Sequence, residues 1–264
     1  MKNILECKGR ALGYFILFLS SQSIIGIIAF LYFALFNSEY QNYFITNMNK
    51  SEYNPLTITN MLLGPITNII IGFSSIFIIF IITKKMIKRE NLKALFNELT
   101  FGKICSLLAI GVLFNILVSS VLYFLPDELL STSGESTSLV LHGNFILVLL
   151  VSGIIAPIAE ELIFRYGMMN NLIKIDIKYG IIYQAAMFGF IHGNLVQGVY
   201  TLLFGLLLGV ICYKSKNILY PIFIHIGLNT SSIIVANLTD NISILFVLLV
   251  IMFTSLIVLA KTHR

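Results

Sequence analysis

A small group of charged residues inside apolar segments is the most unusual feature of this sequence. Glu160 and Glu161 are adjacent at the end of the apolar run 146–163, and Arg165 follows them within one helical turn. A charged side chain at the centre of a bilayer-spanning helix costs about 2.5 to 3.5 kcal/mol on insertion scales. Charges at such positions mark functional sites by default, so we treat these residues as candidates for chemistry.

The spacing of these charges gives the two glutamates different roles. On a helix, Glu161 and Arg165 share a face, so we expect them to form an ion pair. Glu160 is rotated by about 100° from Glu161 and cannot share Arg165 equally. A carboxylate without a partner in a low-dielectric site is a candidate general acid or base. We therefore predict Glu160 as a general base and the pair Glu161 and Arg165 as its support.

Two histidines and an asparagine in later apolar runs have the chemistry to complete a site around a water molecule. Water held by a carboxylate needs a second group to orient it, and a carbonyl under attack needs donors for its developing negative charge. His192 is a candidate for the first role. His225 and Asn229 share one predicted helix face and are candidates for the second. A lone histidine in an apolar helix is more often a packing or hydrogen-bonding residue, but the set together favours catalysis.

The composition shows which elements must hold these residues. Of the 264 residues, 58% are hydrophobic and 11% are charged, compared with roughly 25% charged residues in an average soluble domain. Apolar runs of about 20 residues predict membrane-spanning helices. We expect an all-α polytopic membrane protein, a bundle of about eight transmembrane helices forming one integral membrane domain over 1–264. The predicted spans are 11–36, 61–83, 102–125, 143–164, 179–193, 196–213, 218–236 and 242–260.

The basic residues predict the orientation of these spans. Every Lys and Arg except Lys50 falls on one side of the membrane, with Arg165 assigned to a loop on that side. Positively charged loops stay in the cytoplasm, so we expect a multi-pass protein of the cell membrane with both termini cytoplasmic. The net charge of +5 then reflects topology and contact with anionic lipid of the bilayer, and nucleic acid is not an expected partner.

The predicted spans contain one conflict of depth. At about 1.5 Å per residue, Glu160 lies about 8 Å from Arg165, whereas His192 lies about 21 Å from Lys178. The two side chains can meet only if the fifth span begins later than Lys178 or is strongly tilted. We expect a break in the chain at Gly193 and Asn194 and a water-filled cavity that opens to the cytoplasm.

Three motifs resemble those of a known family. The strings EELIFR at 160–165, FGFIH at 188–192 and HIGLN at 225–229 are similar to the EExxxR, FxxxH and HxxxN motifs of the CPBP family. This family comprises CAAX proteases and bacteriocin-processing enzymes and is also called Abi. The resemblance covers residues 142–236, which we expect to be the catalytic core. It implies an intramembrane endopeptidase of the glutamate-dependent type that needs no cofactor.

The resemblance also implies a role for each motif residue. In the family, the first glutamate and the first histidine activate water, which corresponds to Glu160 and His192. The second histidine and the asparagine form the oxyanion site, which corresponds to His225 and Asn229. The base assigned from charge and spacing agrees with the first of these roles. We expect Phe188 to be a packing residue beside the site.

Other functions are compatible with the same residues. A zinc-dependent intramembrane metalloprotease would use Glu160, His192 and His225 as ligands, although the HExxH motif is absent. A membrane transporter would place its charges along a conduction path. A non-catalytic bacteriocin immunity or scaffold protein would keep the motifs without turnover. If the protein is a protease, prenylated CAAX proteins, peptide precursors and membrane-protein segments are all suitable substrates. The sequence predicts no oligomeric state.

A few remaining residues predict helix contacts. Gly205 and Gly209 have the GxxxG spacing, which favours close packing of two helices. Gln184 and Asn194 are expected either to contact a neighbouring helix or to line a cavity.

Overall fold

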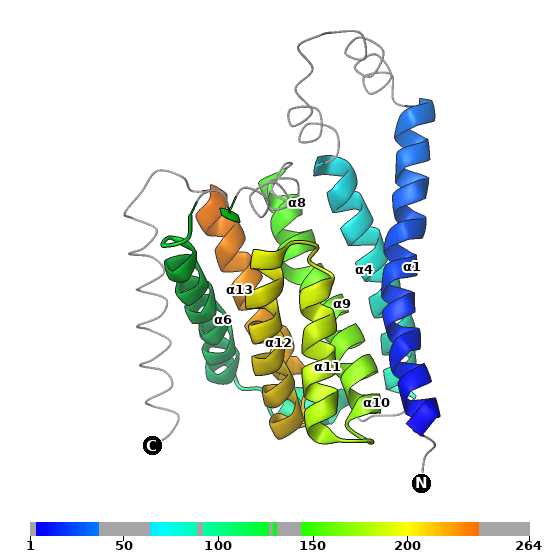
Figure 1. Cartoon of the computed structure of the whole chain (residues 1–264), viewed down its shortest axis with the longest axis vertical. Helices are drawn as coiled ribbons and strands as arrows, with labels where there is room; N and C mark the ends of the chain where they lie inside the picture. The colour runs from blue at the N-terminus through cyan, green and yellow to red at the C-terminus, as the bar shows by residue number, and fades with distance from the viewer. Residues whose placement is uncertain (1–3, 37–63, 89–91, 127–128, 131–143, 238–264) are drawn as a thin grey trace.

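The structure, a computed structural model, describes residues 4–36, 64–88, 92–126, 129–130 and 144–237. The regular structure in these ranges is helical throughout, as predicted (Figure 1). Six helical runs in this part of the chain are long and apolar enough to cross a membrane. The elements are α1 (Ile4–Phe36), α4 (Gly64–Ile87), α5 (Leu92–Asn97), α6 (Phe101–Leu122), α8 (Phe145–Leu150), η2 (Val151–Ile155), α9 (Ala156–Glu161), η3 (Leu162–Met169), α10 (Asn170–Leu172), α11 (Ile177–Phe190), α12 (Leu195–Ser215) and α13 (Leu219–Asn237).

The predicted spans agree with these helices in order and approximate position. The first seven each coincide with a helix or a continuous helical run, and the eighth, 242–260, lies outside the described residues. The fifth of them, α11, has only 14 residues. At about 1.5 Å per residue it is about 21 Å long, shorter than the roughly 30 Å hydrocarbon core of a bilayer.

The fourth span is longer than predicted, and this corrects the position of Arg165. Elements α8 to α10 form one continuous helix from Phe145 to Leu172, with two π-helical segments, η2 and η3. Arg165 is fully buried inside this helix, so its predicted place in a cytoplasmic loop is wrong. The error has a physical cause, because the charge that suggested a helix end is neutralised by Glu161 within the protein.

The longer fourth helix also removes the conflict of depth. Glu160 now lies about 18 Å from the helix end at Leu172, at about 1.5 Å per residue. His192 lies about 22 Å from the start of α11 at Ile177 by the same count. The two side chains therefore reach similar depths without a later start of the fifth span.

The predicted break after α11 is present as a tight turn. Gly193 has φ of +74°, a left-handed conformation that glycine adopts without steric cost. Asn194 then begins α12, because its side chain accepts a hydrogen bond of 2.7 Å from the Gln197 main-chain nitrogen. This turn places His192 at the end of the α11–α12 hairpin. In Figure 1 the hairpin ends below the upper ends of α8 and α13.

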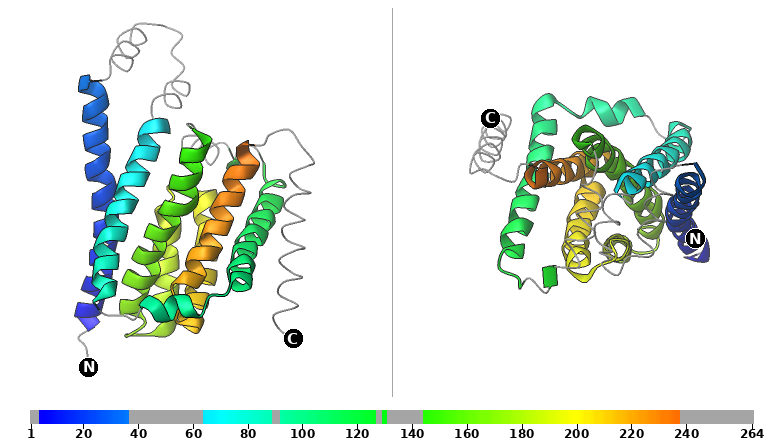
Figure 2. Two further views of the ribbon diagram at one scale, coloured as in Figure 1. Left: turned by 180° about the vertical axis from the view of Figure 1, so that it is seen from behind. Right: turned by 90° about the horizontal axis from the view of Figure 1, so that it is seen from above.

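The long helix α8–α10 is in the interior of the bundle. It packs against α4 on one side and against α13 on another, while α1 covers α4 and η3 (Figures 1 and 2). Helix α11 pairs with α12, and α6 pairs with α13 on the far side. The functional candidates therefore come from α9, from α13, and from α11 with the turn that follows it.

Glycines allow two of these helix pairs to approach closely. A Cβ atom on Gly227 would lie 2.2 Å from the Leu108 carbonyl oxygen, so α13 and α6 are in main-chain contact there. Gly227 lies between His225 and Asn229 on α13, so this contact fixes the position of the helix that carries both.

The predicted GxxxG contact is confirmed between α11 and α12. A Cβ on Gly205 would lie 3.0 Å from the Ala185 Cα, and one on Gly209 would lie 2.6 Å from Gln184 Nε2. Gln184 Nε2 also donates to the Gly205 carbonyl at 2.8 Å. Of the two interpretations left open for Gln184, the structure therefore shows the helix contact.

Candidate active site

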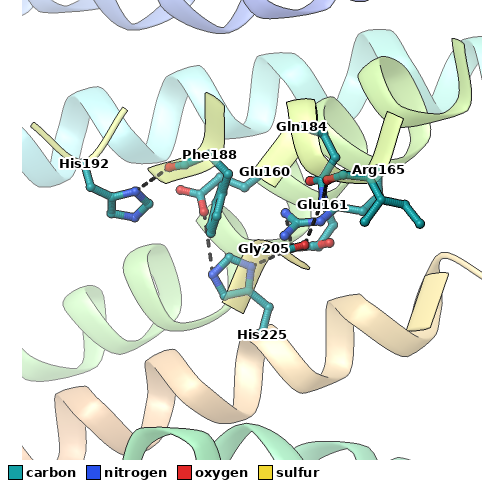
Figure 3. A network of polar contacts seen from close by, with 9 residues as sticks. Glu160, Glu161, Arg165, Gln184, Phe188, His192, Gly205 and His225 are labelled. Atoms are coloured by element: carbon teal, nitrogen blue, oxygen red, sulfur yellow. Dashed lines mark hydrogen bonds and ion pairs between the residues drawn. The ribbon is translucent and has the colours of Figure 1, made fainter. Parts of the chain in front are cut away.

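The ion pair predicted between Glu161 and Arg165 is present at the centre of the bundle. Arg165 Nη1 donates to Glu161 Oε1 at 2.9 Å, and both side chains are fully buried (Figure 3). The Phe188 ring covers the guanidinium, with its centroid 4.6 Å from Arg165 Cζ. Phe188 therefore packs on the guanidinium and adds a cation–π contact to the pair.

His225 lies between the two glutamates. Its Nδ1 is 2.8 Å from Glu161 Oε1, and its Nε2 is 3.6 Å from Glu160 Oε2 (Figure 3). Because the carboxylate of Glu161 can only accept, His225 Nδ1 carries the proton of this bond. Glu161 thus orients the imidazole and leaves Nε2 directed toward Glu160. The sequence did not predict this bond, because the two residues lie on different helices and are 64 positions apart.

His192 is held by the end of its own helix. Its Nδ1 is 2.8 Å from the Phe188 carbonyl oxygen, and its ring packs edge-on against the Phe188 ring at 5.0 Å. Because a carbonyl oxygen only accepts, Nδ1 is the donor, and Nε2 of the neutral ring is an acceptor. His192 can therefore accept a proton or a hydrogen bond from water through Nε2.

Asn229 is anchored by an irregular turn of the fourth helix. Asn229 Nδ2 donates to the Ser152 carbonyl oxygen at 3.0 Å. Ser152 lies in the π-helical segment η2, where the Ala156 N–H bonds to the Val151 carbonyl. The next residue along, Pro157, has no N–H to donate. The Ser152 carbonyl is therefore left available for the asparagine side chain.

One cavity brings together the four residues predicted to be catalytic. It has a volume of about 180 Å³, and Glu160, His192, His225 and Asn229 all line it. The Glu160 side chain is 19% exposed, and Figure 3 shows its carboxylate on the side where both imidazoles lie. The supporting residues Glu161 and Arg165 do not line the cavity. The other lining residues are Ser152, Phe188, Gln197, Tyr200, Thr201, Phe204, Leu228, Ser232 and Ile233.

Sequence reasoning missed the polar wall that α12 contributes to this cavity. Gln197, Tyr200 and Thr201 are spaced three and four residues apart on α12 and line the same space. Polar residues at this helical spacing directly after the Asn194 cap were the signal that would have found them.

The cavity lies toward the α11–α12 turn. Its walls come from the first half of α12 and the later half of α13. Toward the other end of the bundle, Phe164 and Arg165 are fully buried. The turn and the N-terminus lie at opposite ends of the bundle (Figure 1). If the N-terminus is cytoplasmic, this geometry does not support the predicted opening to the cytoplasm.

The donors predicted for a metal do not all converge. Within the described ranges, no group of three or more His, Cys, Asp or Glu side chains lies close enough together to hold one ion. Glu160 and His225 are the nearest two of the predicted set, at 3.6 Å. A metal in this cavity would have to use these two groups first.

Comparisons with known proteins match the same part of the chain. Residues 142–231 match the family described as "Type II CAAX prenyl endopeptidase Rce1-like". The "Putative membrane peptidase YdiL" of Bacillus subtilis (strain 168) is 30% identical over 89 residues, which is 33% of this chain and 36% of that protein's length. No solved structure matches the chain. These matches support the intramembrane protease family that the three motifs predicted.

Proposed function

We propose that the protein cleaves a peptide bond within the membrane by water that Glu160 activates, a proposal that the match of residues 142–231 to this endopeptidase family supports. The observation that carries the proposal is the position of the Glu160 carboxylate. It faces a cavity shared with both histidines and Asn229, while the neighbouring Glu161 is fully buried and already paired.

The attacking water would be held between Glu160 and His192. Glu160 accepts one proton from the water as its oxygen attacks the carbonyl carbon, and His192 Nε2 orients the water by accepting its other hydrogen. The leaving amine then takes a proton from Glu160, which returns the carboxylate to its starting state. Both groups line the cavity, so neither has to move between helices.

His225 and Asn229 would stabilise the negative charge on the carbonyl oxygen. His225 can donate from Nε2 when its ring carries both protons, and the bond from Nδ1 to Glu161 holds the ring in place. A protonated His225 also balances the charge of Glu160 beside it. Asn229 uses one amide hydrogen for the Ser152 carbonyl and keeps the second for the substrate.

The position of the cavity favours a particular kind of substrate. The Glu161–Arg165 pair closes the bundle on the side toward α10, so the substrate would enter from the side of the α11–α12 turn. A peptide segment inserted in the bilayer reaches the cavity from that side more directly than a peptide tail that lies on the membrane surface near α10. We therefore propose a membrane-inserted peptide precursor or protein segment, with prenylated CAAX-like peptides as the family-based alternative.

The experiment is cleavage of a proteome-derived peptide library by the purified protein in detergent, with new termini identified by mass spectrometry. Glu160→Gln keeps the side-chain volume but removes the base, so turnover of the best-cleaved peptide should fall by about 100-fold or more. Glu6→Gln, a change in an exposed pair far from the cavity, is the matched control and should cleave like the wild type. Near-normal turnover by Glu160→Gln would contradict the proposal and leave a transport assay as the next test.

A further inference from the structure

The hydroxyl of Ser152 is buried without a hydrogen-bond partner among the described residues. Other buried serines in these helices donate to their own helix: Ser74 Oγ to the Ile70 carbonyl at 2.6 Å, and Ser106 Oγ to the Gly102 carbonyl at 2.8 Å. An unsatisfied buried polar group destabilises the fold. The Ser152 hydroxyl differs from these two serines and is available to a partner from outside these helices.

Ser152 is placed where such a partner would bind. The residue is 8% exposed and lines the cavity that holds Glu160 and His225. Its main-chain carbonyl accepts the hydrogen bond that anchors Asn229 at 3.0 Å. The Ser152 hydroxyl and the Asn229 amide therefore lie close together on the same wall of the cavity.

The surrounding groups decide what chemistry the hydroxyl can perform. No histidine or carboxylate among the described residues is hydrogen-bonded to Ser152 Oγ, so the residue lacks the adjacent base that activates a serine nucleophile. A neutral hydroxyl can rotate about χ1 and donate one hydrogen bond. Its suitable partner is an oxygen atom of a bound peptide.

We propose that Ser152 is an additional substrate-binding residue, whose hydroxyl donates a hydrogen bond to the carbonyl oxygen of the scissile peptide bond beside Asn229. This rests on the proposed function of the cavity. The π-helical segment η2 then serves the site twice, since one residue anchors Asn229 through its carbonyl and contacts the substrate through its side chain. A π-helical turn at such a position agrees with the frequent occurrence of these turns at functional sites.

Kinetics on the best-cleaved library peptide provide the first test. Ser152→Ala should lower kcat by about 10-fold or more with little change in KM, because the donor acts mainly on the charge of the transition state. Ser152→Thr keeps a hydroxyl and should retain most of the activity. Ser74→Ala removes a buried hydroxyl on α4 that is already satisfied, and should leave kcat unchanged.

Thermal unfolding in detergent provides the second test and does not depend on the substrate. Ser152→Ala should unfold at the same temperature as the wild type or higher, because it removes an unsatisfied group. Ser74→Ala should unfold at a lower temperature, since it loses a hydrogen bond. A loss of stability in Ser152→Ala as large as in Ser74→Ala would show a structural partner and overturn the proposal.

Glu160→Gln separates this inference from the proposed function. An inactive Glu160→Gln together with a wild-type kcat in Ser152→Ala would overturn the role of Ser152 alone. An active Glu160→Gln would instead overturn the function of the cavity on which that role rests.

Discussion

Glu161 is the residue on which the charge balance of the site depends. One oxygen, Oε1, accepts from Arg165 at 2.9 Å and from His225 at 2.8 Å, and the side chain has no contact with solvent. The negative charge of Glu161 thus matches Arg165, and the same carboxylate also orients His225. The two adjacent glutamates therefore have different surroundings, since Glu161 holds the histidine while Glu160 faces the cavity.

Breaking this pair should cost much of the stability of the protein. Arg165→Met removes the cation that neutralises Glu161 inside the bundle, so the free energy of unfolding should fall by about 3 to 5 kcal/mol. Peptide cleavage should fall as well, because the Glu161 carboxylate that holds His225 loses the arginine that fixes its position. Thermal unfolding of the purified protein measures the first effect, and the peptide library assay measures the second.

The chain contains a matched control for this prediction. Glu6 and Arg10 form an ion pair with the same spacing of four residues, but their side chains are 45% and 49% exposed. Arg10→Met should therefore change stability by no more than about 1 kcal/mol. Equal stability losses in Arg10→Met and Arg165→Met would contradict the structural role assigned to the buried pair.

Removal of metal ions should leave the activity intact. Glu160 and His192 can hold and deprotonate water without a cation, so we expect turnover to survive prolonged exposure to EDTA or phenanthroline. Elemental analysis of active protein should give well under one zinc per chain. Loss of activity on chelation and its recovery with added zinc would instead make Glu160 and His225 metal ligands.

At the level of residues, the sequence predicted contacts within a helix better than contacts between helices. The Glu161–Arg165 pair follows from a spacing of four on one helix, and the structure contains it. The bonds from His225 to Glu161 and from Asn229 to Ser152 join distant parts of the chain. Only the folded arrangement determines such contacts. A sequence pattern predicts the helix face on which a residue lies, but not which helix packs against that face.

At the level of elements, the fourth helix decides the shape of the site. Its two π-helical segments lie before and after the short helix α9 that carries both glutamates. The first segment, with Pro157 just after it, provides the carbonyl for Asn229, and the second contains Arg165. The irregular turns within this continuous helix thus set the angles around its axis at which the carbonyl that binds Asn229, the two glutamates and Arg165 are placed.

Close contact of α13 with α6 should be essential for the same geometry. In Gly227→Ala the added Cβ would lie 2.2 Å from the Leu108 carbonyl oxygen, so α13 must shift. We expect a loss of about 1 to 3 kcal/mol in stability and reduced cleavage, because α13 carries His225 and Asn229. Thermal unfolding and the peptide assay together measure both effects.

The control for this change is a glycine with open space around it. A Cβ on Gly13 of α1 would meet no atom within 4 Å. Because alanine favours helices over glycine by about 1 kcal/mol, Gly13→Ala should keep or raise the stability. A Gly227→Ala protein as stable and active as Gly13→Ala would show that the close helix contact is not required.

The positions of the helices could be predicted from hydropathy, but some of their ends could not. The fourth helix continues to Leu172 because the Arg165 charge is neutralised inside the bundle. The first helix begins at Ile4, so Lys8 and Arg10 lie on it and not before it. The short helix α5 has six residues and no apolar run long enough to predict it. A charge therefore does not by itself mark a helix end, whether it is paired inside the bundle, as in Arg165, or exposed on the helix, as in Arg10.

At the level of the whole molecule, the orientation in the membrane is a prediction that labelling can test. In a cysteine-free background, Lys178→Cys at the start of α11 and Tyr123→Cys after α6 place one thiol at each end of the bundle, both at exposed positions. A membrane-impermeant maleimide should label Tyr123→Cys in intact cells and Lys178→Cys only after permeabilisation. The reverse pattern would place the termini outside and the cavity toward the cytoplasm.

The short α11–α12 hairpin has a consequence for the surrounding lipid. With α11 only about 21 Å long, the bilayer beside it must thin or let water reach the turn, which is the response to hydrophobic mismatch. Phe190 and Leu195 are exposed at this turn, at the level where the bilayer has to adapt. Transmembrane segments that are themselves too short for the surrounding bilayer would gather there, beside the entrance to the cavity. The protein would then select its substrates by the length of their transmembrane segments as well as by their side chains.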